Sequence, residues 1–161
     1  MQRALSNSKI KAIGINLTLN QFTNKQVAEQ LIAFRKKTPQ LQSFVIELVE
    51  VPTIDQIKKY SSAYREDNIL LALDDVGSDN TYTEVIELLP HVDQLKFAMQ
   101  NLRTHYEIRL NDTVKFWLDI ATRYHLTFVL EGIEDQLDVA MATQLGIIYG
   151  QGYYYGRPTA I

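Results

Sequence analysis

Short apolar runs alternate with amphipathic stretches from one end of the chain to the other, and this alternation predicts βαβ units around a parallel sheet. Most of the apolar runs are nearly continuous in Val, Ile, Leu and Phe, as expected of strands that are covered on both faces. No low-complexity linker interrupts the pattern, so we expect one domain over residues 1–161. The six candidate strands are residues 12–17, 44–48, 69–73, 94–97, 127–130 and 147–149.

The amphipathic stretches between the candidate strands carry helix start signals. Three Thr-x-x-Gln or Thr-x-x-Glu capping boxes are expected to open helices, and they begin at Thr23, Thr53 and Thr81. Asp135 is expected to cap a last helix. A longer helix is predicted around Trp117, because apolar residues recur there at helical spacing.

The number of units is small for a closed barrel. Eight strand–helix units usually need about 250 residues, whereas this chain supplies six candidate strands in 161 residues. An open sheet and a barrel that lacks its first unit both explain the count. The first candidate strand appears almost at once, so any missing part would lie upstream of Met1.

Composition excludes several classes of function. Hydrophobic residues make up 46% of the chain and charged residues 22%, which is typical of a globular domain. The formal net charge is -3, and no basic stripe favours DNA binding. No apolar run approaches the roughly 20 residues that span a bilayer, and the first residues lack the apolar core of a secretory signal. Cysteine is absent. These features predict a cytoplasmic protein.

Polar side chains recur at the ends of the candidate strands, where parallel α/β folds carry out their chemistry. Each of the six strands delivers an acid, an amide or a lysine to this end of the sheet. In chain order these residues are Asn16, Glu47 with Glu50 beyond it, the pair Asp74 and Asp75, Lys96, Glu131 and Gln151.

Any one of these acids alone is most often a helix cap or a solvated loop residue. Their recurrence is harder to explain in that way, because four carboxylates on one rim would repel one another. A divalent cation relieves such repulsion, and oxygen ligands without His or Cys favour Mg²⁺ or Mn²⁺. Adjacent Asp74 and Asp75 fit a site for two ions, which suits phosphoester hydrolysis. The run YYYG at 153–156 fits either packing at the rim or stacking on a nucleobase.

The motifs resemble those of the EAL domain, a bacterial phosphodiesterase family that hydrolyses cyclic di-GMP to the linear dinucleotide. The resemblance keeps the family's order and rough spacing from about Ile10 to Pro158. It rests on six segments of this sequence, which are GINLT, VIELVE, LALDDVG, QLKFA, LEGIED and GQGYYYGRP.

This resemblance implies an incomplete TIM-like (β/α) barrel and one or two Mg or Mn ions. It implies that Lys96 orients or helps deprotonate the attacking water, and that Glu131 and Gln151 also belong to the catalytic set. Glu50 and Glu134 are expected to act on the substrate or on the loop after the paired aspartates. The implied metal ligands are Asn16, Glu47, Asp74, Asp75 and Glu131.

The chain also departs from the family pattern. The glutamate-alanine-leucine strand, whose glutamate is a metal ligand, would precede Met1. The loop after Asp75 is changed at positions 76–80, and the acid expected two residues after Lys96 is Ala98. We therefore expect a domain that is inactive or weakly active alone. The alternative is a non-catalytic module that binds cyclic di-GMP or another protein. A homodimer or a partner protein is expected to cover the open barrel edge.

Overall fold

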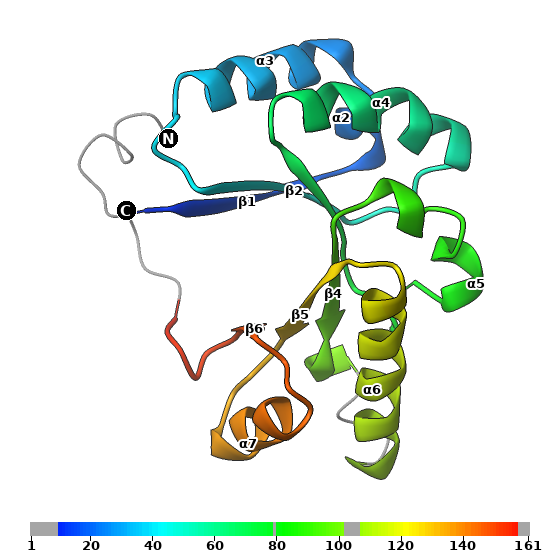
Figure 1. Cartoon of the computed structure of the whole chain (residues 1–161), viewed down its shortest axis with the longest axis vertical. Helices are drawn as coiled ribbons and strands as arrows, with labels where there is room; N and C mark the ends of the chain where they lie inside the picture. The colour runs from blue at the N-terminus through cyan, green and yellow to red at the C-terminus, as the bar shows by residue number, and fades with distance from the viewer. Residues whose placement is uncertain (1–9, 79, 102–106, 158–161) are drawn as a thin grey trace.

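The computed structural model describes residues 10–78, 80–101 and 107–157. Six parallel strands form a single sheet in which every strand pairs with its neighbours in sequence, so the order is β1-β2-β3-β4-β5-β6. The sheet curves around an open concave face (Figure 1). The strands are β1 (Ala12–Leu17), β2 (Ser43–Leu48), β3 (Leu70–Leu73), β4 (Gln94–Ala98), β5 (Thr127–Glu131) and β6 (Tyr149–Gln151).

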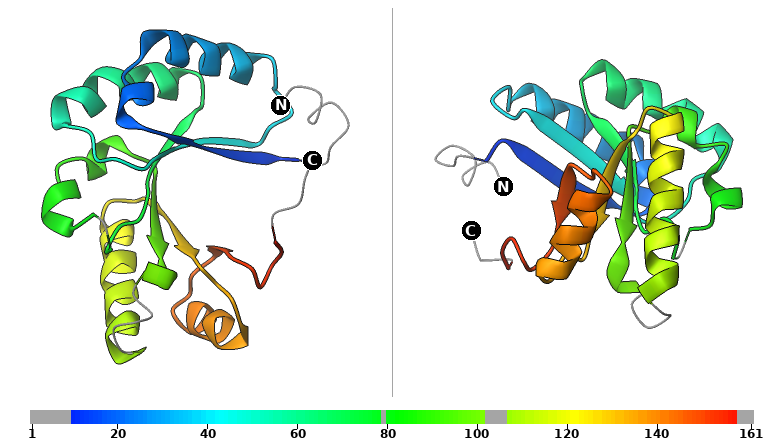
Figure 2. Two further views of the ribbon diagram at one scale, coloured as in Figure 1. Left: turned by 180° about the vertical axis from the view of Figure 1, so that it is seen from behind. Right: turned by 60° about the horizontal axis from the view of Figure 1, so that its bottom comes forward.

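The longer helices of the described residues lie on the convex side of the sheet, as the views from two directions in Figure 2 show. Thr53 and Asp135 cap the helices that follow them, and Thr81 forms the expected capping box with Glu84. The elements are α2 (Leu19–Phe22), α3 (Lys25–Lys36), α4 (Ile54–Glu66), α5 (Tyr82–Val85), α6 (Glu107–Arg123) and α7 (Gln136–Gln144), with the short 3-10 helices η1 (Leu89–His91) and η2 (Met99–Asn101).

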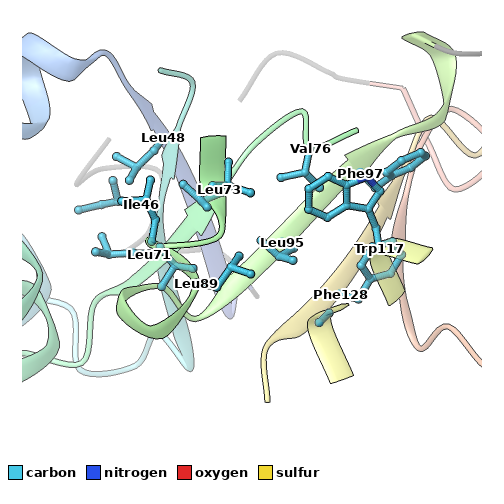
Figure 3. Packing of buried hydrophobic residues seen from close by; sticks show 14 of the residues in the cluster. Ile46, Leu48, Leu71, Leu73, Val76, Leu89, Leu95, Phe97, Trp117 and Phe128 are labelled. Atoms are coloured by element: carbon cyan, nitrogen blue, oxygen red, sulfur yellow. The ribbon is translucent and has the colours of Figure 1, made fainter. Parts of the chain in front are cut away.

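The hydrophobic core lies between the convex face of the sheet and these helices. Side chains of a strand alternate between the two faces, so one set of strand residues points outward to the helices. Ile46, Leu71 and Leu95 belong to this set and are fully buried (Figure 3). Trp117 of α6 closes the core at 2% exposure, which confirms the helix predicted there.

The fold is an open half-barrel, which confirms the predicted incomplete (β/α) barrel. Within the described residues β1 pairs only with β2, and β6 pairs only with β5. Both outer strands therefore present one backbone edge without a partner strand. All three residues of β6 are exposed, as expected of a short strand at such an edge.

Two predictions about element boundaries are wrong. Thr23 does not open a helix, because it ends α2, and its hydroxyl donates to the Leu19 carbonyl. The capping box lies instead at Thr18, and α3 is capped by Asn24. The last strand lies two residues later than the predicted 147–149, because its register with β5 pairs Tyr149 with Val129.

No helix among the described residues is long and apolar enough to span a membrane. Two positions named in the sequence motifs, Asp79 and Pro158, lie outside the described residues.

Candidate metal centre

The strand register brings the predicted site residues onto one face of the sheet. Asn16 pairs with Glu47, which in turn pairs with Ala72, so these three residues share a face. Ala72 pairs with Gln94, and residues two positions further along the same strands, Asp74 and Lys96, return to that face. The same rule carries the face across β5 and β6, because Ala98 pairs with Glu131 and Glu131 with Gln151. This is the concave face of the half-barrel.

Lys96 lies at the centre of the cluster. Its Nζ donates to Glu47 Oε2 at 2.6 Å and approaches Glu131 Oε1 at 2.6 Å and Asp74 Oδ1 at 3.6 Å. The Lys96 side chain is only 5% exposed, and those of its three acidic partners are 10–17% exposed. One ammonium group thus contacts carboxylates from three different strands or strand ends.

The environment shifts the ionisation of this lysine and of Glu131. Burial by itself lowers the pKa of Lys96, but the hydrogen bonds to Glu131 and Glu47 and the charge of Asp74 outweigh burial, so the pKa is raised well above its usual value. Burial raises the pKa of Glu131, and the charges of Asp74 and Glu47 add to this effect while Lys96 opposes it. Lys96 is therefore an ammonium ion at neutral pH.

Three of the predicted metal ligands can share a cation. Asp74, Asp75 and Glu131 each offer a carboxylate oxygen, and these oxygens all lie within 4.8 Å of one another. Asp74 and Glu131 are buried and Asp75 is half-buried. An oxygen-only donor set of this kind fits Mg²⁺ or Mn²⁺. The residues present therefore fit the divalent ion that the sequence predicts.

The other predicted site residues differ in how closely they join this cluster. Gln151 Nε2 donates a hydrogen bond to Glu131 Oε1. Asn16 lies next to Glu47 in the register, but its exposed side chain makes no hydrogen bond to a described residue. Glu50 is also exposed, and none of the hydrogen bonds and ion pairs between described residues involves its side chain. The roles expected of these three residues stay predictions.

A cavity of about 340 Å³ adjoins the cluster on the β6 side. Glu131 and Gln151 line it together with Glu134, whose substrate role also stays a prediction. Tyr153, the first tyrosine of the YYYG run, forms part of the wall, and the Arg157 guanidinium lies 5.2 Å from the centre of its ring. Acidic, amide and aromatic side chains thus meet in one concave space.

Sequence reasoning missed two residues that shape this face. Gln100 lines the cavity, and its amide lies over Gly132, where a Cβ atom would clash with it. Gln100 belongs to η2 and carries no local signal of this position. Gly14 leaves space for the Glu47 carboxylate, because a Cβ at Gly14 would also clash with it. A glycine inside a strand often marks such a close approach, so Gly14 was detectable in principle.

The half-barrel fold and its acidic strand ends define the class of domain, a parallel α/β barrel with a polar site at the carboxyl ends of its strands. The chain belongs to the EAL domain family, whose model matches residues 1–158. The probable cyclic di-GMP phosphodiesterase PdeG of Escherichia coli is 25% identical over 154 residues, which are 91% of this chain and 30% of PdeG. The uncharacterized EAL-domain containing protein YkuI of Bacillus subtilis is 27% identical over 135 residues, which are 81% of this chain and 33% of YkuI.

Solved EAL structures share the fold. The crystal structure of Bacillus subtilis YkuI in complex with cyclic di-GMP and calcium matches 98% of this chain and 40% of that chain, with a TM-score of 0.78 and 22% identity. The EAL domain of FimX from Pseudomonas aeruginosa, bound to cyclic di-GMP, matches 98% of this chain and 66% of that domain, with a TM-score of 0.79 and 16% identity. This chain spans about a third of the length of the curated relatives it matches.

Proposed function

We propose that this chain binds a divalent cation and cyclic di-GMP at the concave face, with little or no turnover of the nucleotide by itself. The observation that carries the proposal is the cluster of Asp74, Asp75 and Glu131 carboxylates, two of which also contact Lys96. It lies beside a cavity lined by Glu134 and other polar residues. Two solved structures with the same fold support the choice of ligand, because cyclic di-GMP is bound in the YkuI and FimX structures.

Each part of the cluster has a distinct role in this proposal. Asp74, Asp75 and Glu131 would hold Mg²⁺ or Mn²⁺, with Glu47 and Asn16 as further oxygen donors. When bound, the cation would polarise a phosphoryl oxygen and offset its negative charge. The Lys96 ammonium group would donate hydrogen bonds to a phosphoryl oxygen or to water, since an ammonium ion has donors only. Gln151 would keep the Glu131 carboxylate oriented through its amide hydrogen bond.

The same arrangement argues for slow hydrolysis. Hydrolysis forms a bond from water oxygen to phosphorus, breaks the bond from phosphorus to the ribose oxygen, and moves a proton from the water to that oxygen. A general base must first accept the proton, and a lysine with a raised pKa is already protonated. Lys96 is thus suited to orient water rather than to deprotonate it. Ala98 stands where the family pattern has a further acid, so β4 supplies no carboxylate that could act as the base there.

Parallel binding and turnover measurements on the whole chain test the proposal. We expect cyclic di-GMP to bind in the presence of Mn²⁺, while linear dinucleotide forms slowly or not at all. Asp74→Asn should abolish Mn²⁺ binding, because it removes a central carboxylate. Lys58→Ala, which removes an exposed lysine of α4, is the matched control for Lys96→Ala. Rapid turnover that Lys96→Ala abolishes would make the chain a full enzyme. Absence of Mn²⁺ binding, or of cyclic di-GMP binding, would refute the proposal.

A second candidate function is a protein-interaction module. The unpartnered edges of β1 and β6 favour it, because an exposed parallel strand edge offers backbone groups to another chain. Ile148, which precedes β6, is 85% exposed. A homodimer or a partner protein would cover these edges. Sedimentation at increasing protein concentration tests the homodimer, and a monomer at all concentrations would leave only a different partner protein.

A further inference from the structure

The loop that follows the paired aspartates is tied together by Asn80, a residue with no role in the site described above. Asn80 is buried at 9% exposure. Its side-chain Nδ2 donates to the Asp74 carbonyl at 2.7 Å. Its backbone N–H donates to the Asp75 carbonyl at 3.3 Å, and its carbonyl accepts from the Gly77 N–H at 2.8 Å. One asparagine thus joins the end of the loop to both aspartates at its start.

The backbone at Asp75 needs such support. Asp75 has a φ of 51°, in the left-handed region that costs most residues free energy. The Asp75 N–H donates to Asp74 Oδ1 at 3.0 Å, so the backbone conformation at Asp75 also fixes the orientation of the Asp74 carboxylate. A change in this backbone would therefore move both carboxylates of the acidic pair.

The outer side of the loop is packed against the rest of the domain. Val76 is fully buried, and its N–H donates to the Lys96 carbonyl at 3.1 Å. Gly77 has a φ of 86°, and a Cβ there would lie 2.5 Å from the Trp117 indole nitrogen and 2.6 Å from the Phe97 ring. Val76, Phe97 and Trp117 all belong to the buried hydrophobic cluster that Figure 3 draws. Val76 and Gly77 therefore fix the loop against the core, and Asn80 links the two ends of the loop by hydrogen bonds.

We propose that Asn80 is a positioning residue that holds the backbone of the paired aspartates in the conformation that binds the cation. This inference rests on the proposed function of the site. Asn80 fixes the loop through its own hydrogen bond to Asp74. The residue expected to steady this loop was Glu50, whose side chain makes no hydrogen bond or ion pair to a described residue.

Asn80→Ala removes the only bond from the Asn80 side chain to Asp74 that the structure describes, and it leaves a buried carbonyl without its donor. We expect the Mn²⁺ dissociation constant to rise about tenfold and the exchange of the Gly77 amide hydrogen to accelerate by a similar factor. Asn80→Asp keeps the shape but cannot donate to a carbonyl, so it should accelerate the same exchange. Calorimetric titration with Mn²⁺ and hydrogen exchange followed by NMR measure the two effects.

Thr81→Ala is the matched control, because Thr81 is the next residue and its side chain bonds forward to Glu84 in α5. Thr81→Ala should lower the free energy of unfolding but leave the Mn²⁺ affinity unchanged. The Gly77 amide should exchange no faster than the lower global stability of this variant accounts for. Unchanged Mn²⁺ affinity in Asn80→Ala would overturn the inference while the metal site itself stands. Failure of the unaltered chain to bind Mn²⁺ would refute the proposed function and, with it, a role of Asn80 in cation binding. Unchanged Gly77 exchange in both Asn80 variants would overturn the loop anchor in either case.

Discussion

At the scale of single residues, the charge balance of the concave face depends on Lys96. Its ammonium contacts three carboxylates and is almost completely buried. A buried ion pair contributes little net stability, but removing one partner leaves an uncompensated buried charge. The free-energy cost of that removal exceeds the stability that the intact pair contributes. The cluster therefore makes Lys96 important for folding as well as for any chemistry.

We predict that Lys96→Met lowers the free energy of unfolding by about 3 kcal/mol in a metal-free buffer. Saturating Mn²⁺ should restore more stability to the variant than it adds to the unaltered chain, because the cation then supplies the missing positive charge. Urea unfolding with and without Mn²⁺ measures both effects. Lys58→Met provides the control, and a variant that gains less from Mn²⁺ than the unaltered chain does would contradict the prediction.

Tyr64 is a second residue whose buried polar group lowers the stability of the fold. It is fully buried and stacks on Phe22, and its hydroxyl is the one buried side-chain polar atom without a hydrogen-bond partner among the described residues. Burial, with a smaller contribution from Tyr60, raises the pKa of Tyr64 to about 12. The folded state thus favours the neutral phenol, while the unfolded chain ionises near the ordinary value of about 10.

Tyr64→Phe should therefore stabilise the domain by up to about 1 kcal/mol at neutral pH. Between about pH 10 and 12 the unaltered chain should lose a further 2 to 3 kcal/mol through the ionisation of Tyr64 in the unfolded state, and the variant should not. Chemical unfolding over this pH range measures the difference. Tyr60→Phe, at a partly exposed position, serves as control, and a stability difference that does not grow with pH would refute the pKa argument.

At the scale of elements, helix caps distinguish two threonines with the same local pattern. The Thr53 hydroxyl accepts from the Gln56 N–H at 3.3 Å, and the Gln56 side chain accepts from the Thr53 N–H at 2.8 Å. The Thr23 hydroxyl only donates back to the carbonyl four residues earlier. We predict that Thr53→Ala costs about 1 kcal/mol of unfolding free energy and Thr23→Ala less than half of that. Thermal unfolding compares them, and equal losses would contradict the assignment of the caps.

This pair also indicates how far the sequence determines the elements. Thr-x-x-Gln occurs at Thr18 and again at Thr23, so local chemistry permits either start. The burial of Phe22 favours the start at Thr18, because α2 then places the Phe22 side chain in the core. The predicted start of the last strand is wrong because residue type alone does not determine strand pairing. Ile148 is a residue type that favours strands, but pairing with β5 begins only at Tyr149.

The candidate site was more predictable than these boundaries. Polar residues that follow buried strands of a parallel sheet converge at one edge, whatever the local detail. Lys96 and Glu47 are far apart in sequence, yet the register of β2, β3 and β4 alone brings them together. The tertiary bond from Asn80 to Asp74 was not predictable, because no local pattern indicates which loop amide becomes buried.

At the scale of the whole molecule, the acidic cluster of the concave face carries a formal charge as large as that of the entire chain. The formal net charge of the chain is -3. Glu47, Asp74, Asp75 and Glu131 together with Lys96 contribute a formal charge equal to this total, so the remaining residues are formally neutral in sum. The cluster therefore contributes a local negative field at the site at which cations are proposed to bind.

We predict that Mn²⁺ affinity depends strongly on ionic strength. The affinity should fall several-fold when the KCl concentration rises from about 20 mM to about 500 mM, since salt screens the field that attracts the cation. Titration calorimetry at both concentrations checks this. Equal affinities would mean that local coordination alone, without the field of the acidic face, determines binding.

The position of Lys96 has a consequence for the proposed binding of a cation. The Lys96 ammonium group already lies among the carboxylates, so a cation that binds there would compete with it for the same carboxylate oxygens. The free energy of cation binding would then be less favourable than that of coordination alone, because Lys96 would lose contacts to the carboxylates. The same ammonium group balances the carboxylates when no metal is bound, so we expect the domain to stay folded without a metal ion.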